Sequence, residues 1–410
     1  MSIVDVIAPK RLGSAFRLLL ASSWLSNTGD GMAIAAGPLL VASLTHNAFL
    51  IASGAFLQWL APLLFGLPAG ALSDRLNRKL IVITADVLRV VILIAISIAV
   101  AVGSVSIGLV LAGLFLLGTA EVFGDNTSST LLPMLVARED LAIANARLQV
   151  GFITVNQLAG PPIGAALFAA GRAWPFVGQA LLVMSGVLMV SRIALPAHVR
   201  GGTGETTVRQ DIAAGFTWVR RHAAVRTLVL TIFTFNITFG AAWSVLVLYA
   251  SRRLDLGSIG FGLIATVSAA GGLLGTTSYG WIIRRVSLGN IMRVGLIIET
   301  LTHLGLALAT SPWVALPIFF VFGAHAFVWG TTSLTVRQRA VPHDLQGRVS
   351  SVNTIGVFGG LVIGSVIGGA LAQHFGITAP FWFAFAGSGV FVCAIWRQLS
   401  HIAYDDVRAD

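Results

Sequence analysis

The chain has 410 residues, of which 56% are apolar and only 10% are charged. Soluble domains carry about 25% charged residues, so the composition excludes a soluble globular protein and predicts an all-α membrane protein. The net charge is +10. The basic residues recur singly or in pairs between apolar segments, which argues against nucleic acid and for the lipid bilayer as a partner. The single cysteine, Cys393, excludes an internal disulfide.

Twelve apolar segments are each long enough to cross a bilayer as a helix. The first is too long for a signal-peptide core, so we expect it to be retained as a span. The predicted spans are residues 15–44, 48–72, 80–102, 107–132, 149–170, 175–195, 226–250, 257–283, 288–309, 313–336, 349–373 and 378–400.

Lysine and arginine are distributed unequally between the two ends of these spans. Arg172, Arg252 and Arg253 fall in odd-numbered connections and Arg89 falls within a span. Every other basic residue lies at a terminus, in an even-numbered connection or in an adjoining helix end. Because cytoplasmic loops carry the excess of Lys and Arg, we predict both termini in the cytoplasm and a location in the plasma (inner) membrane.

The longest connection divides the spans six and six. We predict an N-terminal bundle over residues 1–195, a linker over 196–225 and a C-terminal bundle over 226–410. Gly201 to Gly204 indicates a flexible linker. Val208 to Arg221 has an apolar helical face, which fits either a helix on the inner membrane surface or a solvated linker helix.

The two halves of the sequence repeat one another. With a shift of 204 residues, Asp140 falls on Asp344 and Gly160 falls on Gly364, each in the same loop-then-helix context. This predicts two parallel six-helix repeats, which is the architecture of major facilitator transporters.

A polar hairpin separates the second and third spans, and it must turn at a membrane surface because charges in hydrocarbon are costly. It resembles the loop between helices two and three of the major facilitator superfamily. Asn77 stands where the family has glycine, and asparagine also tolerates the left-handed conformation. The matching positions are Gly70, Leu72, Asp74, Arg75, Arg78 and Lys79.

Other stretches narrow this resemblance to one branch of the superfamily. The segments 132–146 and 341–349 resemble loops of bacterial drug and siderophore exporters. Gly29-Asp30-Gly31 resembles a segment of the mycobacterial multidrug exporters. The resemblance implies a transporter that uses the proton gradient and alternates between inward- and outward-facing states. The sequence carries no metal-spaced His/Cys cluster, phosphate loop or nucleophile motif, so we expect neither an enzyme nor a metal or cofactor site.

Ionisable residues inside spans are functional candidates, because burying a charge in a bilayer is expensive. Asp30 lies near the middle of the first span between two glycines. The resemblance places it on a cavity-lining helix, where it can bind a proton or a cationic substrate; the alternative is a structural cap or pair. Glu121, on the fourth span, is the second candidate proton carrier.

Asp86 and Arg89 are three residues apart on the third span, and Asp125 follows Glu121 by one turn on the fourth. We expect these charges to form a network, because isolated charges would be too costly there. The resemblance also implies a charge cluster of Asp74, Arg78 and Asp125, which in the family holds the two halves together on the cytoplasmic side. The gating candidates are therefore Gly70, Asp74, Arg75, Arg78, Lys79, Asp86, Arg89 and Asp125, although a static ion network is an equal alternative for Asp86 and Arg89.

Aromatic and amide residues on predicted cavity helices suit amphipathic ligands through stacking and cation–π contact. Packing of Trp243 and Trp329 against neighbouring residues is the alternative. On the ninth span, we expect Glu299 and His303, one turn apart, to form a structural pair. The cavity-lining candidates are Asn27, Asn236, Phe239, Trp243, His325 and Trp329.

The fifth span resembles the glycine–proline motif of the superfamily's antiporters, which is associated with export. Its proline, Pro161, should kink the helix, and its glycines, Gly151, Gly160 and Gly164, should allow tight packing against the other half.

These features together predict a monomeric proton-coupled exporter of amphipathic or cationic small molecules. Two alternatives are a siderophore or metabolite exporter and a membrane scaffold or regulator that does not transport.

Overall fold

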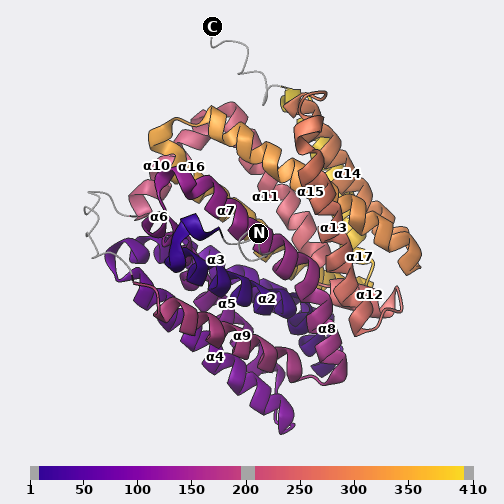
Figure 1. Cartoon of the computed structure of the whole chain (residues 1–410). Helices are drawn as coiled ribbons and strands as arrows, with labels where there is room; N and C mark the ends of the chain where they lie inside the picture. Colours follow the sequence, from indigo (N-terminus) through magenta and orange to yellow (C-terminus); the bar gives the residue numbers. More distant parts are fainter. Residues whose placement is uncertain (1–8, 195–207, 401–410) are drawn as a thin grey trace. The chain divides into compact units, whose positions relative to one another are not determined.

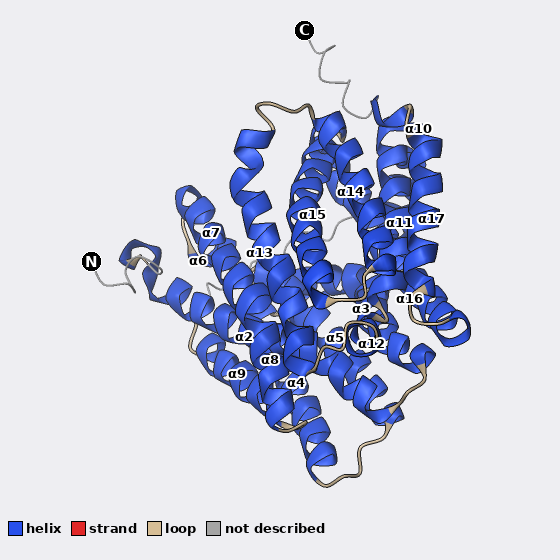
Figure 2. Ribbon diagram, turned by 90° about the vertical axis from the view of Figure 1, so that its right-hand side faces the viewer, coloured by secondary structure: helices blue, strands red, loops and turns tan. Residues whose placement is uncertain are grey.

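The computed structural model describes residues 9–194 and 208–400, and within those ranges every regular element is a helix (Figure 2). Figure 1 labels the α-helices. Their bounds are α2 (Gly13–Leu44), α3 (Ala48–Arg75), α4 (Arg78–Ala101), α5 (Ile107–Ser129), α6 (Leu132–Leu135), α7 (Leu141–Gly151), α8 (Gly160–Ala170), α9 (Trp174–Ser191), α10 (Val208–Arg221), α11 (Ala223–Trp243), α12 (Leu246–Arg252), α13 (Ser258–Ile282), α14 (Leu288–Leu308), α15 (Pro312–Ala340), α16 (Gln346–Phe375) and α17 (Ala379–Ile395).

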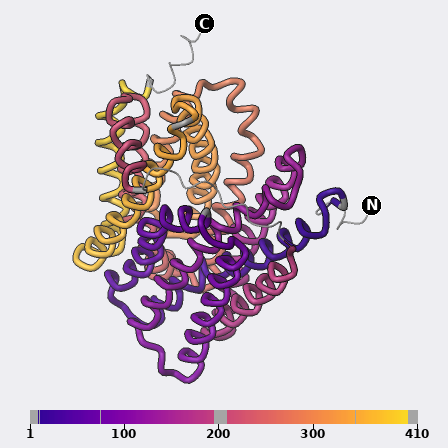
Figure 3. Tube along the Cα trace, turned by 90° about the vertical axis from the view of Figure 1, so that its left-hand side faces the viewer, coloured from indigo at the N-terminus to yellow at the C-terminus, as the bar shows by residue number. Residues whose placement is uncertain are grey.

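The chain divides into two compact units, and each is formed mainly by one half of the sequence. Unit 1 contains the described residues of Met1–Leu44, Leu64–Gly204 and Phe261–Thr266. Unit 2 contains those of Thr45–Leu63, Glu205–Gly260 and Val267–Asp410. The helices α3 and α13 therefore each contribute to both units. Figure 3 follows the chain through them in sequence order. The predicted boundaries at residues 195 and 226 stay a prediction.

Within the described ranges, ten helical segments are long and apolar enough to cross a membrane. Two of the predicted spans are not among them: residues 15–44 coincide with α2, which does not meet this criterion, and residues 378–400 coincide with α17, a shorter apolar helix. The count of twelve spans and the internal repeat therefore stay predictions. The predicted cytoplasmic termini and the Gly201–Gly204 linker lie outside the described residues.

Several spanning helices begin at a polar side chain that accepts a hydrogen bond from a free amide of the first turn. Asn77 Oδ1 accepts a hydrogen bond from the Leu80 N–H at 3.2 Å and caps α4. Ser106 caps α5 and Ser287 caps α14 in the same way. The φ of Asn77 is −67°, so the turn does not use the left-handed conformation that asparagine tolerates; the residue is extended and caps α4 with its side chain.

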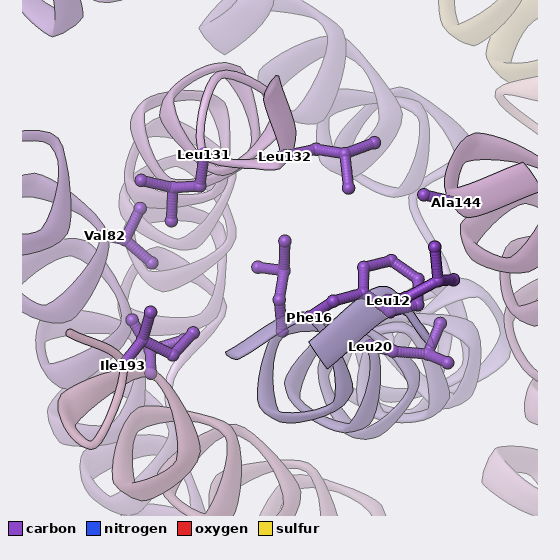
Figure 4. Close-up of a cluster of buried hydrophobic side chains, with 10 residues drawn as sticks. Leu12, Phe16, Leu20, Val82, Leu131, Leu132, Ala144 and Ile193 are labelled. Atoms are coloured by element: carbon purple, nitrogen blue, oxygen red, sulfur yellow. The ribbon is translucent and has the colours of Figure 1, made fainter. Parts of the chain in front are cut away.

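The core of unit 1 lies where the start of α2 meets the ends of the neighbouring helices (Figure 4). Phe16 is fully buried there, between residues from α4, α6 and α7. The buried members of this cluster are Leu12, Phe16, Leu19, Leu20, Val82, Leu131, Leu132, Ala144, Val190 and Ile193.

The amphipathic segment of the linker folds as α10 with the predicted bounds. Asp211 Oδ1 accepts a hydrogen bond from Arg348 Nε at 2.9 Å. Gly215 lies directly against the Arg348 backbone, and Val219 joins an apolar cluster with Val349 and Val352. The helix is therefore docked on the start of α16, which neither sequence-based alternative for this segment included. Phe216 remains exposed on its outer face.

Candidate functional site

A buried ion network joins three helices of unit 1. Arg89 on α4 is only 2% exposed, and its two terminal nitrogens contact different acids. Nη1 donates to Asp86 Oδ1 at 3.1 Å, and Nη2 donates to Asp30 Oδ1 on α2. Gln179 Nε2 on α9 donates to the same Asp30 oxygen at 3.2 Å. The guanidinium fork fits this role, because it presents several donors in one plane.

The sequence predicted the Asp86–Arg89 pair, which is confirmed. For Asp30 it left a structural pair as the alternative to a proton or substrate site, without naming the partner. In the structure Asp30 belongs to the same network, and its side chain is 11% exposed. Gly29 explains the geometry in part, because an added Cβ there would lie 3.0 Å from Gln179 Cγ. The glycine lets α2 and α9 approach closely enough for the amide to reach the carboxylate.

Two further acids lie next to the network, on α5. Glu121 and Asp125 both interact electrostatically with Asp30, Asp86 and Arg89. Between them, Gly124 packs against Asp86, since an added Cβ would lie 3.6 Å from Asp86 Oδ1. Glu121 is partly buried, whereas Asp125 is exposed at the surface of the unit. The four acids therefore extend from the interior of the helix bundle to its surface.

The charges in this cluster do not balance. In the described part of the chain, the electrostatic partners of Glu121 are Asp30, Arg89, Asp125 and Asp86. One arginine thus faces four carboxyl groups. Repulsion between ionised carboxylates at low dielectric is strong, so this arrangement favours the uptake of a proton or the binding of a cation. We call Asp30, Asp86, Arg89, Glu121 and Asp125 the acid cluster.

Next to the acid cluster, the fifth predicted span is not a uniform helix. α7 and α8 are joined by a π-helix, Phe152–Ala159. Pro161 and Pro162 open α8, and because proline has no N–H they leave the carbonyls of Gln157 and Leu158 without their helical donors. The Thr266 hydroxyl, from α13, donates to the Leu158 carbonyl at 3.0 Å. The predicted kink is therefore a π-helical turn, with its freed carbonyl bonded by another helix.

The glycines of this span pack against α2, so the prediction that they face the other half is wrong. An added Cβ at Gly160 would collide with Gly31, one at Gly164 with Met32, and one at Gly151 with the Trp24 ring. The physical reason is that α2 supplies a matching glycine, Gly31, at the crossing. From α13, it is Gly262 that approaches Pro161 and Ala165.

The π-helix also contacts α2 near Asp30. Asn156, which is buried, donates from Nδ2 to the Asn27 carbonyl at 3.2 Å, and Gln157 Nε2 donates to Asn156 Oδ1 at 2.7 Å. Asn27 bonds its own helix through Ser23. Asn27 is thus one turn before Asp30 in a polar contact between α2 and the π-helix.

The gating candidates of the hairpin differ in their surroundings: some bond backbone carbonyls and others are exposed. Lys79 Nζ donates to the carbonyls of Ser191 and Ile193 at 2.7 Å, so it caps the end of α9. Arg78 Nε donates to the Ser73 carbonyl at 3.2 Å. Arg75 is exposed, and an added Cβ at Gly70 would meet no described atom within 4 Å. The side chain of Asp74 lies outside what the structure describes. The gating role stays a prediction.

Aromatic residues predicted to line a cavity form a stacked cluster in unit 2. Phe239 and Trp243 on α11 stack with their ring centroids 4.3 Å apart. Phe322 on α15 lies 4.7 Å from Trp243, and Phe319 packs edge-on against the same ring at 6.0 Å. Both α11 rings remain partly exposed. Trp243 thus packs against neighbouring rings, as the alternative for this residue expected.

The polar candidates near this cluster have different partners from those expected. Asn236 bonds its own helix at the Ile232 carbonyl. His325 Nε2 lies 3.6 Å from Glu299 Oε2. The expected Glu299–His303 pair is therefore wrong: α15 packs on α14 closely enough for His325 to reach the acid instead. Trp329 is partly buried, one turn beyond His325, with its indole N–H unpaired among the described residues.

Three residues of the site were missed by sequence analysis, namely Gln179, Asn156 and Thr266. Each is a polar residue within an apolar helix. That signal was present, but their partners lie 108 to 149 residues away along the chain. Within the described residues, no group of three His, Cys, Asp or Glu side chains could hold a metal ion.

Comparison with known proteins shows which family the chain resembles along its length. The model of the family described as transmembrane secretion effector matches residues 5–406. The multidrug efflux pump Tap of Mycolicibacterium fortuitum is 26% identical over 390 residues, which cover 89% of this chain and 90% of that protein.

Solved structures share the fold. A bacterial homologue of the iron transporter ferroportin, in its inward-facing state, superposes with a TM-score of 0.75 at 16% identity, covering 98% of this chain and 100% of that one. The nucleoside transporter NupG superposes with a TM-score of 0.72 at 13% identity, covering 95% and 99%. At these identities the likeness shows the fold alone.

Proposed function

The chain belongs to the transmembrane secretion effector family of the major facilitator superfamily, and from this we propose that it is a proton-coupled exporter of amphipathic, especially cationic, small molecules. It is a multi-pass membrane transporter and not an enzyme. The further proposal covers the direction of transport, the coupling ion, the substrate class, a monomeric state and an inner-membrane location with cytoplasmic termini.

The excess of acids in the acid cluster carries this proposal. Four carboxyl groups face one arginine, which favours neutralisation of the cluster by protons or by a cation. A cationic substrate and a proton satisfy the same requirement, and binding one favours release of the other. Exchange of protons for substrate follows from this competition. Asp125, which is exposed, gives protons or cations access to the cluster.

The aromatic stack of unit 2 supports the substrate class. Phe239 and Trp243 are partly exposed aromatic residues, and aromatic rings attract organic cations through cation–π contact. The alternative of an anionic siderophore or metabolite needs a free cation in the site. Arg89 does not provide one, since it is bound to both Asp30 and Asp86. A scaffold that does not transport has no need of an unbalanced acid cluster within its helices.

The test is transport in proteoliposomes with an acidic lumen, using ethidium as a cationic probe. The wild type should accumulate ethidium in the lumen as protons leave. Asp30→Asn removes one exchangeable charge and should abolish accumulation. Asp140→Asn, an acid of a loop that pairs with the largely exposed Arg11, is the matched control and should transport normally. Accumulation by Asp30→Asn equal to that of the control would place coupling elsewhere.

A further inference from the structure

Unit 2 holds a second buried ionisable pair that the acid cluster does not include. Glu299 is near the middle of α14 and His325 near the middle of α15. Their side chains are 13% and 4% exposed, and Nε2 of the histidine lies 3.6 Å from Oε2 of the acid. Gly295, one turn before Glu299, makes room for the ring, because an added Cβ would lie 3.0 Å from His325 Nδ1.

A second histidine lies beside the pair. His303 is one turn after Glu299 on α14 and is completely buried. Neither of its ring nitrogens has a hydrogen-bond partner among the described residues. Buried polar groups are normally paired, and each exception requires an explanation. Because complete burial disfavours the charged imidazolium, His303 is a neutral ring that borders the pair and does not itself take up a proton.

Within the described part of the chain, Glu299 is the sole acid near His325. On the helices packed against the pair, none of the other ionisable side chains is a carboxylic acid. They are Arg226 on α11, Tyr249 and Arg252 on α12, Tyr279 on α13, Arg293 on α14, Arg337 and Arg339 on α15, and Cys393 on α17. A charge in a spanning helix is costly, and apolar residues of the same volume would often be as stable as an ion pair.

The contact geometry distinguishes this pair from a closed structural ion pair. Charge-assisted hydrogen bonds are about 2.7–2.9 Å long, whereas the Glu299–His325 separation is 3.6 Å. We propose that Glu299 and His325, bordered by the buried ring of His303, form a second proton-binding site, in unit 2, which gains and loses a proton independently of the acid cluster. This goes beyond the proposed function, which assigns protons to unit 1 alone.

The second site also contacts the aromatic cluster. The ring of His325 lies 6.0 Å from that of Phe322, and the ring of His303 lies 6.0 Å from that of Trp243 in an edge-on arrangement. Trp243 in turn stacks on Phe239. A proton gained by His325 changes the charge beside Phe322, which lies against Phe239 and Trp243. Protonation of the second site should therefore weaken binding of a cationic aromatic ligand by charge repulsion.

Histidine protonation can be followed directly in the full-length protein. The chain has eight histidines, and ring-¹⁵N labelling in lipid nanodiscs reports the protonation of each by NMR. Signals of His325 are assigned by their loss in His325→Asn. Between pH 5 and 9, the His325 ring should change protonation state in the wild type. In Glu299→Gln it should lose its proton at lower pH, because the carboxylate that stabilises the imidazolium is gone.

The matched control is His374→Asn, which removes an exposed histidine at the end of α16 and should leave the His325 titration unchanged. A His325 ring that keeps one protonation state from pH 5 to 9 in both proteins would overturn the proposal. So would a titration that Glu299→Gln does not move. This readout does not require transport, so the inference can fail while Asp30→Asn still abolishes ethidium accumulation, and the reverse.

Discussion

At the scale of residues, the most constrained side chain is Arg89. It is almost fully buried and holds acids from two helices, Asp30 and Asp86, with its two terminal nitrogens. Removing one partner of a buried ion pair leaves an uncompensated charge. The arginine therefore has a stabilising role as well as its part in the acid cluster, and the two can be separated by experiment.

Arg89→Met should lower the free energy of unfolding by about 3–5 kcal/mol, because it leaves Asp30 and Asp86 without their cation. Arg89→Lys should lose less, since it keeps the charge but cannot present the planar fork. The measurement is thermal unfolding of detergent-solubilised protein, with the exposed Arg172→Met as control.

Adding Asp30→Asn to Arg89→Met should restore part of the lost stability, because one of the two unpaired acids is neutralised. If Arg89→Met unfolds at the same temperature as Arg172→Met, the arginine does not hold the acids together and the network described here is wrong.

At the scale of elements, the π-helix between α7 and α8 depends on a hydroxyl from α13. Pro162 removes the helical donor of the Leu158 carbonyl, and Thr266 Oγ1 replaces it at 3.0 Å. The same region of α13 packs against Pro161 through Gly262. Thr266 is therefore a positioning residue for the helix that contacts α2 beside Asp30.

Thr266→Val should lower the free energy of unfolding by about 1–3 kcal/mol, because the shape is kept while a carbonyl loses its partner. Thr277→Val is the matched control: its hydroxyl bonds the carbonyls of its own helix and it is exposed. Both variants are compared by thermal unfolding. Equal stability of the two would mean that the Leu158 carbonyl does not need Thr266.

These helices and their contacts show which parts of the fold and of the site could be predicted from the sequence. Apolar length and the charges between spans predicted the helices, and i, i+3 spacing predicted the Asp86–Arg89 pair, because both are local properties. The partners of Asp30 and Glu299 could not be predicted, since they depend on which helices cross and how closely. Gly29 and Gly295 allow the close approach of Gln179 and His325, respectively. The position of a glycine in the sequence does not indicate which helix it will contact.

At the scale of the whole molecule, the distribution of Lys and Arg predicts that the connection containing Ser251 faces outside and the connection after α3 faces the cytoplasm. Cysteine labelling tests this in a Cys393→Ala background. Ser251 is exposed and suits labelling, whereas Ser73 is buried, so Leu76, which is 49% exposed, is the better inner position.

Membrane-impermeant maleimide added to whole cells should label Ser251→Cys and not Leu76→Cys. Permeabilised cells should show labelling of both, which confirms that the inner position is reactive. Labelling of Leu76→Cys in intact cells would reverse the predicted orientation of the spans.

The central claim is that the acid cluster exchanges protons for a cationic substrate, and the most direct measurement counts the protons released as ligand binds. Ethidium is added to purified protein in weakly buffered detergent solution containing a pH indicator. The wild type and Asp140→Asn should release protons in proportion to ethidium bound, and Asp30→Asn should release fewer. If Asp30→Asn releases as many protons per ethidium as the wild type, or if the wild type binds ethidium without releasing any, the exchange described here does not occur.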